Sequence, residues 1–302
     1  MNERKVDFAV KRTRKLAPLE NAMQLLFFLC GAVAVAFVLV ITVYLVVSGL
    51  PAIQKVGLGN FLLGTTWDSA NKTDPQYGIL PFILTSIYGT AGAILIGVPV
   101  GFMTAMFLAK AAPPKLAAVV RPAVDLLAGI PSVVYGMVGM AVLLPGIRTL
   151  FHLKAGDTLL AAILVLAVMI LPSIISVSET ALRAVPREYE EASLALGATE
   201  METYFRVSAP AAKSGIAAAV VLGVGRAIGE AMAIMMVAGN AANMPGLFRS
   251  VKFLTTAVAS EMSYAADGSL QKMALFSIGL VLFLFIMMIN VFLNLVLKRE
   301  KE

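Results

Sequence analysis

The sequence predicts an all-α polytopic membrane protein with six transmembrane helices, and three observations support this fold class. The first is composition: 59% of the 302 residues are hydrophobic, only 14% are charged, and the mean hydropathy is +0.88. A soluble domain is about 25% charged and about 45–50% apolar, and it could not cover so much apolar surface with polar groups. The composition argues against a soluble enzyme and excludes a disordered chain, which needs low hydrophobicity and high charge.

The second observation is a set of apolar stretches that are each long enough to cross a bilayer. A hydrocarbon core about 30 Å thick requires about 20 apolar residues in a helix, and open strands cannot satisfy their backbone groups in lipid. We expect the first stretch to be a transmembrane helix of the mature protein and not a cleaved signal peptide, because it is longer than the apolar core of about 7–15 residues in a signal peptide. The predicted spans are Leu25–Val47, Phe82–Leu108, Pro122–Leu144, Thr158–Val177, Gly215–Gly239 and Met273–Leu297.

The third observation is the distribution of positive charge. Lys and Arg concentrate in both tails and in the loops after the second and fourth predicted spans, which places both termini and those loops in the cytoplasm. The net charge of +6 therefore reflects topology and does not indicate a nucleic-acid partner. We expect a basic tail over residues 1–20 and one transmembrane domain over 21–302, with a cytoplasmic loop at about 178–214 and an outer loop at about 240–272.

The cytoplasmic loop before the fifth predicted span carries its own helix signals. Pro186 suits a first helical position, and acidic residues follow in the first turns, where the helix dipole favours them. Gly197 then interrupts, and Thr199 with Glu202 fits a capping box. The pattern predicts a helix, a glycine break and a second helix. A small apolar face among the charges suits docking to a soluble partner, and a solvated hairpin without a partner fits the same pattern.

Two charged residues, Arg226 and Glu230, lie within the fifth predicted span. An Arg at the centre of a membrane helix costs about 2.5–3.5 kcal/mol, so it faces the interior of the bundle or a polar path. The i, i+4 spacing puts both side chains on one helix face. One interpretation is a buried ion pair that fixes helix register. The other is that Arg226 binds an anionic substrate in a translocation path, since a guanidinium matches phosphate or sulfate oxygens, while Glu230 holds Arg226 between substrates.

A second unusual site lies at Pro131 in the third predicted span. Proline removes a backbone donor, so the helix should bend or unwind there, and Ser132 can satisfy freed backbone groups. Tyr135 follows one turn later. Ser132 and Tyr135 are further candidates for lining a path, although spacing alone does not decide this.

The cytoplasmic loop resembles the signature of ABC importer permeases, which reads Glu-Ala-Ala, three residues, Gly, nine residues, Ile-x-Leu-Pro. Here the same spacing carries Glu191-Ala192-Ser193, Gly197 and Val207-Ser208-Ala209-Pro210, with small departures at Ser193, Val207 and Ala209. In that family the segment is a coupling helix that sits in a cleft of the ATP-hydrolysing subunit. The coupling residues that the resemblance implies are Glu190, Glu191, Ala192, Ser193, Leu196, Gly197 and Ala198.

Further stretches resemble the PstC family of phosphate-specific ABC importer permeases, namely Asn60–Trp67, Tyr77–Ile83, Gly129–Gly136 and Gly225–Ala233. The resemblance implies a type I importer permease in the bacterial cytoplasmic (inner) membrane, forming half of a path for inorganic phosphate. Arg226 and Glu230 match the charged pair of that family's motif. The implied partners are a PstA-like second permease, two ATP-binding subunits and an extracytoplasmic phosphate-binding protein.

The chain is not expected to be an enzyme. It contains no Gly-x4-Gly-Lys-Ser/Thr motif, so ATP and Mg²⁺ are expected on a partner, with no cofactor or metal bound by this chain. Its single Cys30 and single His152 provide neither a disulfide framework nor a Cys/His metal cluster. The alternatives are a permease for molybdate or sulfate, the partner phosphate permease, or an ion-coupled secondary transporter. The last would need repeats with matching broken helices.

Overall fold

The computed structural model describes residues 3–69, 71 and 73–299, and the side chains from residue 20 to residue 291 apart from positions 70 and 72. The chain forms two compact units, which divide between Ser48 and Gly49. The side chains of the predicted basic tail therefore lie outside the described residues, save for the last position, residue 20. Helix α1 covers Glu3–Val56. From residue 20 its side chains are mostly apolar and largely exposed up to the unit boundary, as expected for a helix that faces lipid or another chain.

Hydropathy identified most membrane helices correctly. Among the described residues, five helices are long and apolar enough to cross a membrane, and a sixth span results if one bent pair of helices is counted as a single crossing. Four predicted spans coincide with α1, α3 (Leu80–Met106), α7 (Leu159–Arg183) and α14 (Leu270–Arg299). The bent pair turns through 73° between Glu200–Ala211 and α11 (Lys213–Gly229). The all-α polytopic fold class is confirmed.

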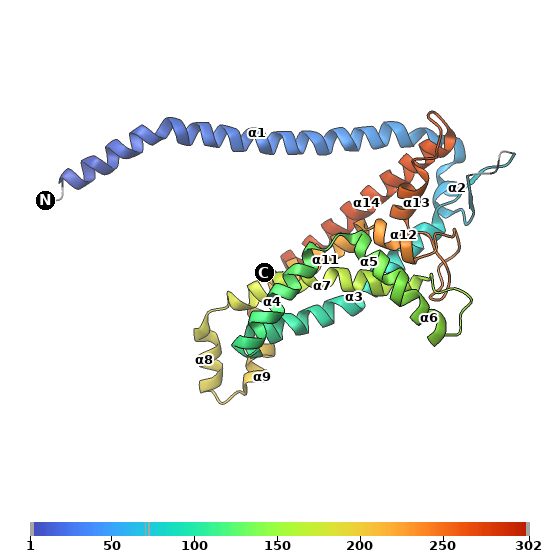
Figure 1. Ribbon diagram of the computed structural model, residues 1–302. Coiled ribbons are helices and arrows are strands. Elements are labelled where there is room, and N and C mark those ends of the chain that lie inside the picture. Colours follow the sequence, from blue (N-terminus) through green and yellow to red (C-terminus); the bar gives the residue numbers. More distant parts are fainter. Residues whose placement is uncertain (1–2, 70, 72, 300–302) are drawn as a thin grey trace. The chain divides into compact units, whose positions relative to one another are not determined.

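Helix α7 lies at the centre of the second unit, between α3 and α11 (Figure 1). Small residues let these helices approach closely. A Cβ atom at Gly97 of α3 would lie 2.6 Å from Cδ1 of Ile170, and one at Gly101 would lie 2.8 Å from Cγ2 of Ile174. Both isoleucines are fully buried. The glycines thus allow α7 side chains to fill the interface with α3.

The predicted third span, Pro122–Leu144, has the wrong boundaries because Pro131 breaks the helix. Helix α4 (Pro114–Gly129) ends before the break, and Ile130 is extended with φ −69° and ψ 128°. A residue before proline is sterically biased away from helical geometry, and proline itself cannot donate a backbone hydrogen bond. The helix resumes as α5 (Ser132–Val138), the π-helix η2 (Gly139–Leu143) and α6 (Leu144–Leu150). The candidate span here is Ser132–Leu150.

The predicted fifth span, Gly215–Gly239, is also not one continuous helix. Helix α11 ends at Gly229, Glu230 is extended with φ −73° and ψ 131°, and α12 covers Met232–Val237. The Glu230 carboxylate accepts a hydrogen bond from the backbone N–H of Ala233 at 2.9 Å. This satisfies one of the first-turn donors that a new helix start leaves free. The Glu230 side chain therefore stabilises the helix break between α11 and α12, which contains no proline.

The two short helices that follow the breaks pack on each other. Gly136 of α5 faces α12 so closely that a Cβ atom there would lie 3.0 Å from Cα of Ala233. Gly139 similarly faces Val237 and Val165 of α7. The broken segments thus form one packed region beside the central helix.

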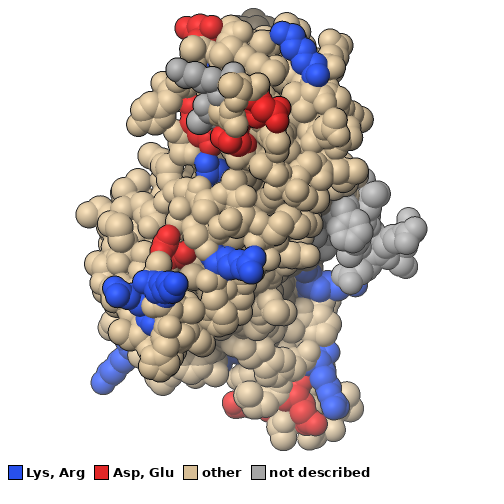
Figure 2. Space-filling model, turned by 90° about the vertical axis from the view of Figure 1, so that its right-hand side faces the viewer, with Lys and Arg blue, Asp and Glu red and all other residues tan. Residues whose placement is uncertain are grey.

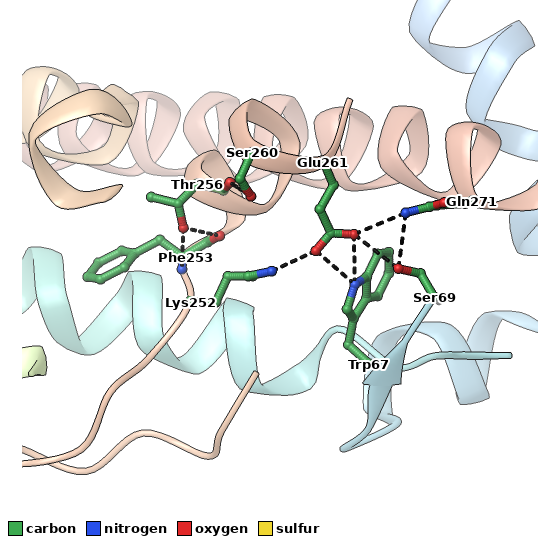
Figure 3. Close-up of polar contacts among 8 residues, drawn as sticks. All are labelled: Trp67, Ser69, Lys252, Phe253, Thr256, Ser260, Glu261 and Gln271. Carbon is green, nitrogen blue, oxygen red and sulfur yellow. Dashed lines mark hydrogen bonds and ion pairs between the residues drawn. The ribbon is translucent and has the colours of Figure 1, made fainter. Parts of the chain in front are cut away.

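The outer end of the second unit contains several small elements. They are α2 (Leu58–Leu63), a hairpin of β1 (Trp67–Asp68) and β2 (Gln76–Tyr77), and α13 (Leu254–Glu261). The Glu261 carboxylate accepts hydrogen bonds from Trp67 Nε1, Ser69 Oγ and Gln271 Nε2 and pairs with Lys252 Nζ at 2.6 Å (Figure 3). This carboxylate ties the hairpin to α13, α14 and the segment before α13.

The predicted helix–glycine–helix pattern of the cytoplasmic loop is confirmed. Helix α8 covers Arg187–Ala195, and Gly197 has φ 88°, a left-handed conformation that glycine adopts without steric cost. The capping box of Thr199 and Glu202 then begins α9 (Glu200–Thr203). The π-helix η3 (Tyr204–Ser208) and α10 (Ala209–Ala211) lead to α11, and another π-helix, η1 (Phe107–Ala111), ends α3.

Candidate functional site

Arg226 lies on α11 beside a cavity that contains other polar groups. The cavity has a volume of about 500 Å³ and is lined by Ser173 of α7, Asn290 of α14 and four residues of α11. Nη1 of Arg226 donates to Oγ of Ser173 at 3.4 Å. A guanidinium, a hydroxyl and an amide therefore meet among apolar membrane helices. Each of these groups can donate a hydrogen bond to an anion.

A larger cavity is chemically less suited to an ion. It has a volume of about 840 Å³ and lies along α5, η2 and α6 against α7. Its lining is almost wholly apolar, with Tyr135 as the single hydroxyl-bearing residue. An anion would lose hydration there without gaining charged donors. The smaller cavity at Arg226 is the better candidate for a substrate.

The helix break separates Arg226 from Glu230. Since α11 ends at Gly229, the i, i+4 relation of a continuous helix does not apply to this pair. The Glu230 carboxylate is bonded to the Ala233 N–H, and its backbone carbonyl accepts from Oγ1 of Thr255 at 2.7 Å. Glu230 thus holds the break together, and the structure gives no support to a buried ion pair between these two described side chains.

Tyr135 supports the other break. Its hydroxyl donates to the Leu127 carbonyl at 2.7 Å. This is the carbonyl that the N–H of residue 131 would bond in a continuous helix, and Pro131 has no N–H to give. Helix α5, which follows this break, packs on α12, which follows the end of α11 at Gly229, so the two breaks belong to one packed region. Ser132 is the first residue of α5 and is half-buried.

The coupling residues predicted on α8 and directly after it separate into outward and inward sets. Leu196 is 91% exposed. The other exposed members are Glu191, Ala192 and Gly197, and Ala198 is half-buried. The inward set is Glu190, which forms an ion pair with Lys110 of η1 and accepts from Oγ of Ser208 at 2.7 Å, and Ser193, whose hydroxyl lies 2.9 Å from that of Thr203.

Electrostatics favour the ionised form of the inward carboxylate. Burial raises the pKa of Glu190, but the hydrogen bonds from Lys110 and Ser208 and the charges of Lys110 and Arg187 outweigh it, so the pKa lies below its ordinary value. The backbone N–H and hydroxyl of Thr199 likewise lower the pKa of Glu202. Both carboxylates are charged at neutral pH.

Sequence reasoning missed a charged cluster at the cytoplasmic end of the helices. Glu179 of α7 is buried, and it accepts from Nε of Arg121 at 2.5 Å and from Nε of Arg183 at 2.9 Å. Both arginines also donate to the Leu108 carbonyl in η1, at 3.0 and 3.3 Å. The i, i+4 spacing of Glu179 and Arg183 was a visible signal, whereas nothing local pointed to Arg121.

Asn290 was also missed, although a signal existed, because it is an isolated amide in the apolar run of α14. Within the part of the chain that the structure describes, no group of three or more His, Cys, Asp or Glu residues could hold a metal ion.

Comparisons with known proteins identify relatives of this chain. A family model described as "Binding-protein-dependent transport system inner membrane component" matches residues 97–301. The probable ABC transporter permease protein YqgH of Bacillus subtilis is 41% identical over 268 residues, which cover 86% of each chain. The phosphate transport system permease protein PstC of Haemophilus influenzae is 37% identical, over 87% of this chain and 88% of its own.

A solved structure shares the fold. An inward-facing structure of the MetNI methionine ABC transporter aligns with a TM-score of 0.58 and 21% identity, covering 74% of this chain and 95% of its own. At this identity the likeness concerns the fold alone.

Proposed function

Because the chain belongs to the family of binding-protein-dependent transport system inner membrane components, we propose that it forms half of a path for inorganic phosphate. The chain is a permease subunit of an ABC importer in the inner membrane and has a transport role. The proposal concerns its substrate, its path residues and its partners. PstC relatives with 31–37% identity over most of the chain support phosphate as the substrate.

The observation that carries the proposal is Arg226 beside its polar cavity. A charged guanidinium in a membrane helix is costly, and an oxyanion that binds it in a bidentate manner recovers part of that cost. The hydroxyl of Ser173 and the amide of Asn290 line the same cavity and would bind further phosphate oxygens. Glu230, Ser132 and Tyr135 act indirectly, because they shape the two helix breaks near Arg226.

The cytoplasmic loop is the proposed contact with a separate ATPase. Large apolar side chains on α8 and around its end are exposed, including Tyr189 at 55%, Leu194 at 44% and Leu196 at 91%. Burying such a face in a groove of a soluble protein is favourable. ATP and Mg²⁺ would be bound by that subunit, in two copies, with a PstA-like permease completing the path.

The outer end would meet an extracytoplasmic phosphate-binding protein. Figure 2 views the molecule from the right-hand side of Figure 1, where the β1–β2 hairpin and α2 of the outer end lie, and basic and acidic side chains are scattered over the largely uncharged surface that faces the viewer. Such a mixed surface suits a specific contact with a protein, since it lacks a single-sign field over the visible face.

The test is phosphate uptake by vesicles that contain the assembled importer with Arg226→Gln or Arg226→Lys. We expect Arg226→Gln to abolish uptake while the complex still assembles. Arg226→Lys should retain partial uptake, because it keeps the charge and loses the bidentate geometry. Wild-type uptake by Arg226→Gln would refute the assignment. Uptake that persists with an inactivated ATPase partner would instead indicate a secondary transporter.

A further inference from the structure

The ion pair between Lys110 and Glu190 connects the coupling helix α8 to the end of a membrane helix. The two side chains are largely shielded from water, with exposures of 10% for Lys110 and 18% for Glu190. Lys110 belongs to η1, which directly continues α3, and Glu190 lies in the first turns of α8. The contact therefore joins two elements that are separated by α4 to α7 in sequence.

A second set of bonds closes this junction. Oγ of Ser208 in η3 donates to the Glu190 carboxylate at 2.7 Å, and the hydroxyl of Tyr204 in η3 donates to the Lys110 carbonyl at 3.2 Å. Both η1 and η3 are π-helical turns, a geometry that is rare and concentrated at functional sites. Through η3 and α10 the chain continues into α11, which carries Arg226.

We propose that Lys110, Glu190, Ser208 and Tyr204 form a strut that passes displacement of α8 to α3 and α11, so that Glu190 is a positioning residue for energy coupling. This inference rests on the proposed docking of α8 to an ATPase. The strut gives the two neighbouring glutamates different tasks. Glu191 is exposed on the docking side, whereas Glu190 faces inward and fixes α8 to the membrane helices.

An ion pair suits this role because it is costly to break and because its hydrogen bonds have fixed directions. A shielded ion pair with additional hydrogen bonds is costly to break, because each partner would be left as an uncompensated charge. Coupling between sites needs contacts that keep their arrangement while the elements move. Apolar contacts of α8 alone would hold the helix without fixing its rotation. The bonds of Glu190 fix both its distance from η1 and its orientation.

The strut predicts a defect in coupling that is separate from a defect in assembly. Lys110→Met and Glu190→Gln leave the exposed apolar face of α8 unchanged, so the variants should still copurify with the ATPase. We expect the phosphate transported per ATP hydrolysed to fall about tenfold, a common size for the coupling between contacting residues. The charge-reversed double variant Lys110→Glu/Glu190→Lys should recover most of the ratio.

The experiment measures radiolabelled phosphate uptake and ATP hydrolysis together in vesicles that contain the complete importer. Arg206→Met is the matched control, because Arg206 is 80% exposed and its ion pair with Glu202 spans 3.9 Å; it should keep the wild-type ratio. If Lys110→Met fails to assemble, Glu190→Gln carries the test, since it keeps the size of the side chain and removes the charge that pairs with Lys110.

Two results would overturn the strut. One is a wild-type ratio in both single variants, and the other is a charge-reversed variant that stays as uncoupled as the single variants. Failure of the proposed function looks different, because the wild-type chain itself would then fail to copurify with an ATPase or to move phosphate.

Discussion

Replacement of Glu179 by Gln should destabilise the protein by a measurable amount. The Glu179 side chain is 10% exposed and bonds two guanidinium groups, at 2.5 Å from Arg121 and 2.9 Å from Arg183. Breaking a buried ion pair costs about 3–5 kcal/mol. The arginine side chains are 35% and 47% exposed, so water screens part of their repulsion, and we expect a loss of about 1–3 kcal/mol in the free energy of unfolding.

Thermal unfolding in detergent, followed by circular dichroism, measures this effect. The matched control is Asp267→Asn, which removes an ion pair with Lys272 in which Asp267 is 96% exposed. Asp267→Asn should leave the melting temperature unchanged, whereas Glu179→Gln should lower it clearly. Equal melting temperatures for the two variants would refute the reasoning that Glu179, through Arg121 and Arg183, holds α4 and η1 against α7.

Three further predictions follow from the same contacts. Gly197→Val should lower the free energy of unfolding by about 1–2 kcal/mol, because Gly197 has φ 88° and L-residues avoid left-handed geometry. Copurification with the ATPase should also weaken, and an unchanged complex would count against a coupling role. The pKa of Glu190 lies below its ordinary value of 4.5. Its ionised carboxylate therefore stabilises the folded protein fully above pH 4.5, and this contribution is lost as the pH falls through the lowered pKa. Melting temperatures measured from pH 7 to pH 3 should show this acid-dependent loss in the wild type and lack it in Glu190→Gln. Asn290→Leu should raise the KM for phosphate about tenfold or more, which corresponds to the loss of one hydrogen bond to a charged group. Assembly with the ATPase should stay intact. An unchanged KM would refute a contact between Asn290 and the transported phosphate.

Local signals in the sequence were sufficient for much of the fold. Apolar stretches located four spans closely, because hydropathy reports directly on the membrane. The break at Pro131 was expected from a missing backbone donor, and the box of Thr199 and Glu202 from capping chemistry; the structure contains both. The break at Glu230 was not predicted, since its cause is a carboxylate that turns to the Ala233 N–H and leaves no pattern in the sequence.

The parts of the site that escaped prediction depend on contacts between distant residues. Arg226 and Ser173 are 53 residues apart, and Arg121 and Glu179 are 58 apart. No local periodicity specifies such pairs. The cost of a charge in lipid identified Arg226 as a candidate, but only the fold shows that Ser173 and Asn290 line its cavity. Similarly, the motif spacing drew attention to Glu191, whereas the structure shows that Glu190 contacts the membrane helices.

We propose above that this permease moves phosphate past Arg226 at the expense of ATP. The most direct measurement is uptake of radiolabelled phosphate by vesicles that contain the wild-type importer with its binding protein, in competition with unlabelled phosphate, sulfate or molybdate. We expect ATP-dependent uptake that unlabelled phosphate suppresses and that sulfate and molybdate leave unchanged, with no uptake in Arg226→Gln. Uptake suppressed equally by sulfate or molybdate, or uptake that survives Arg226→Gln, would contradict it.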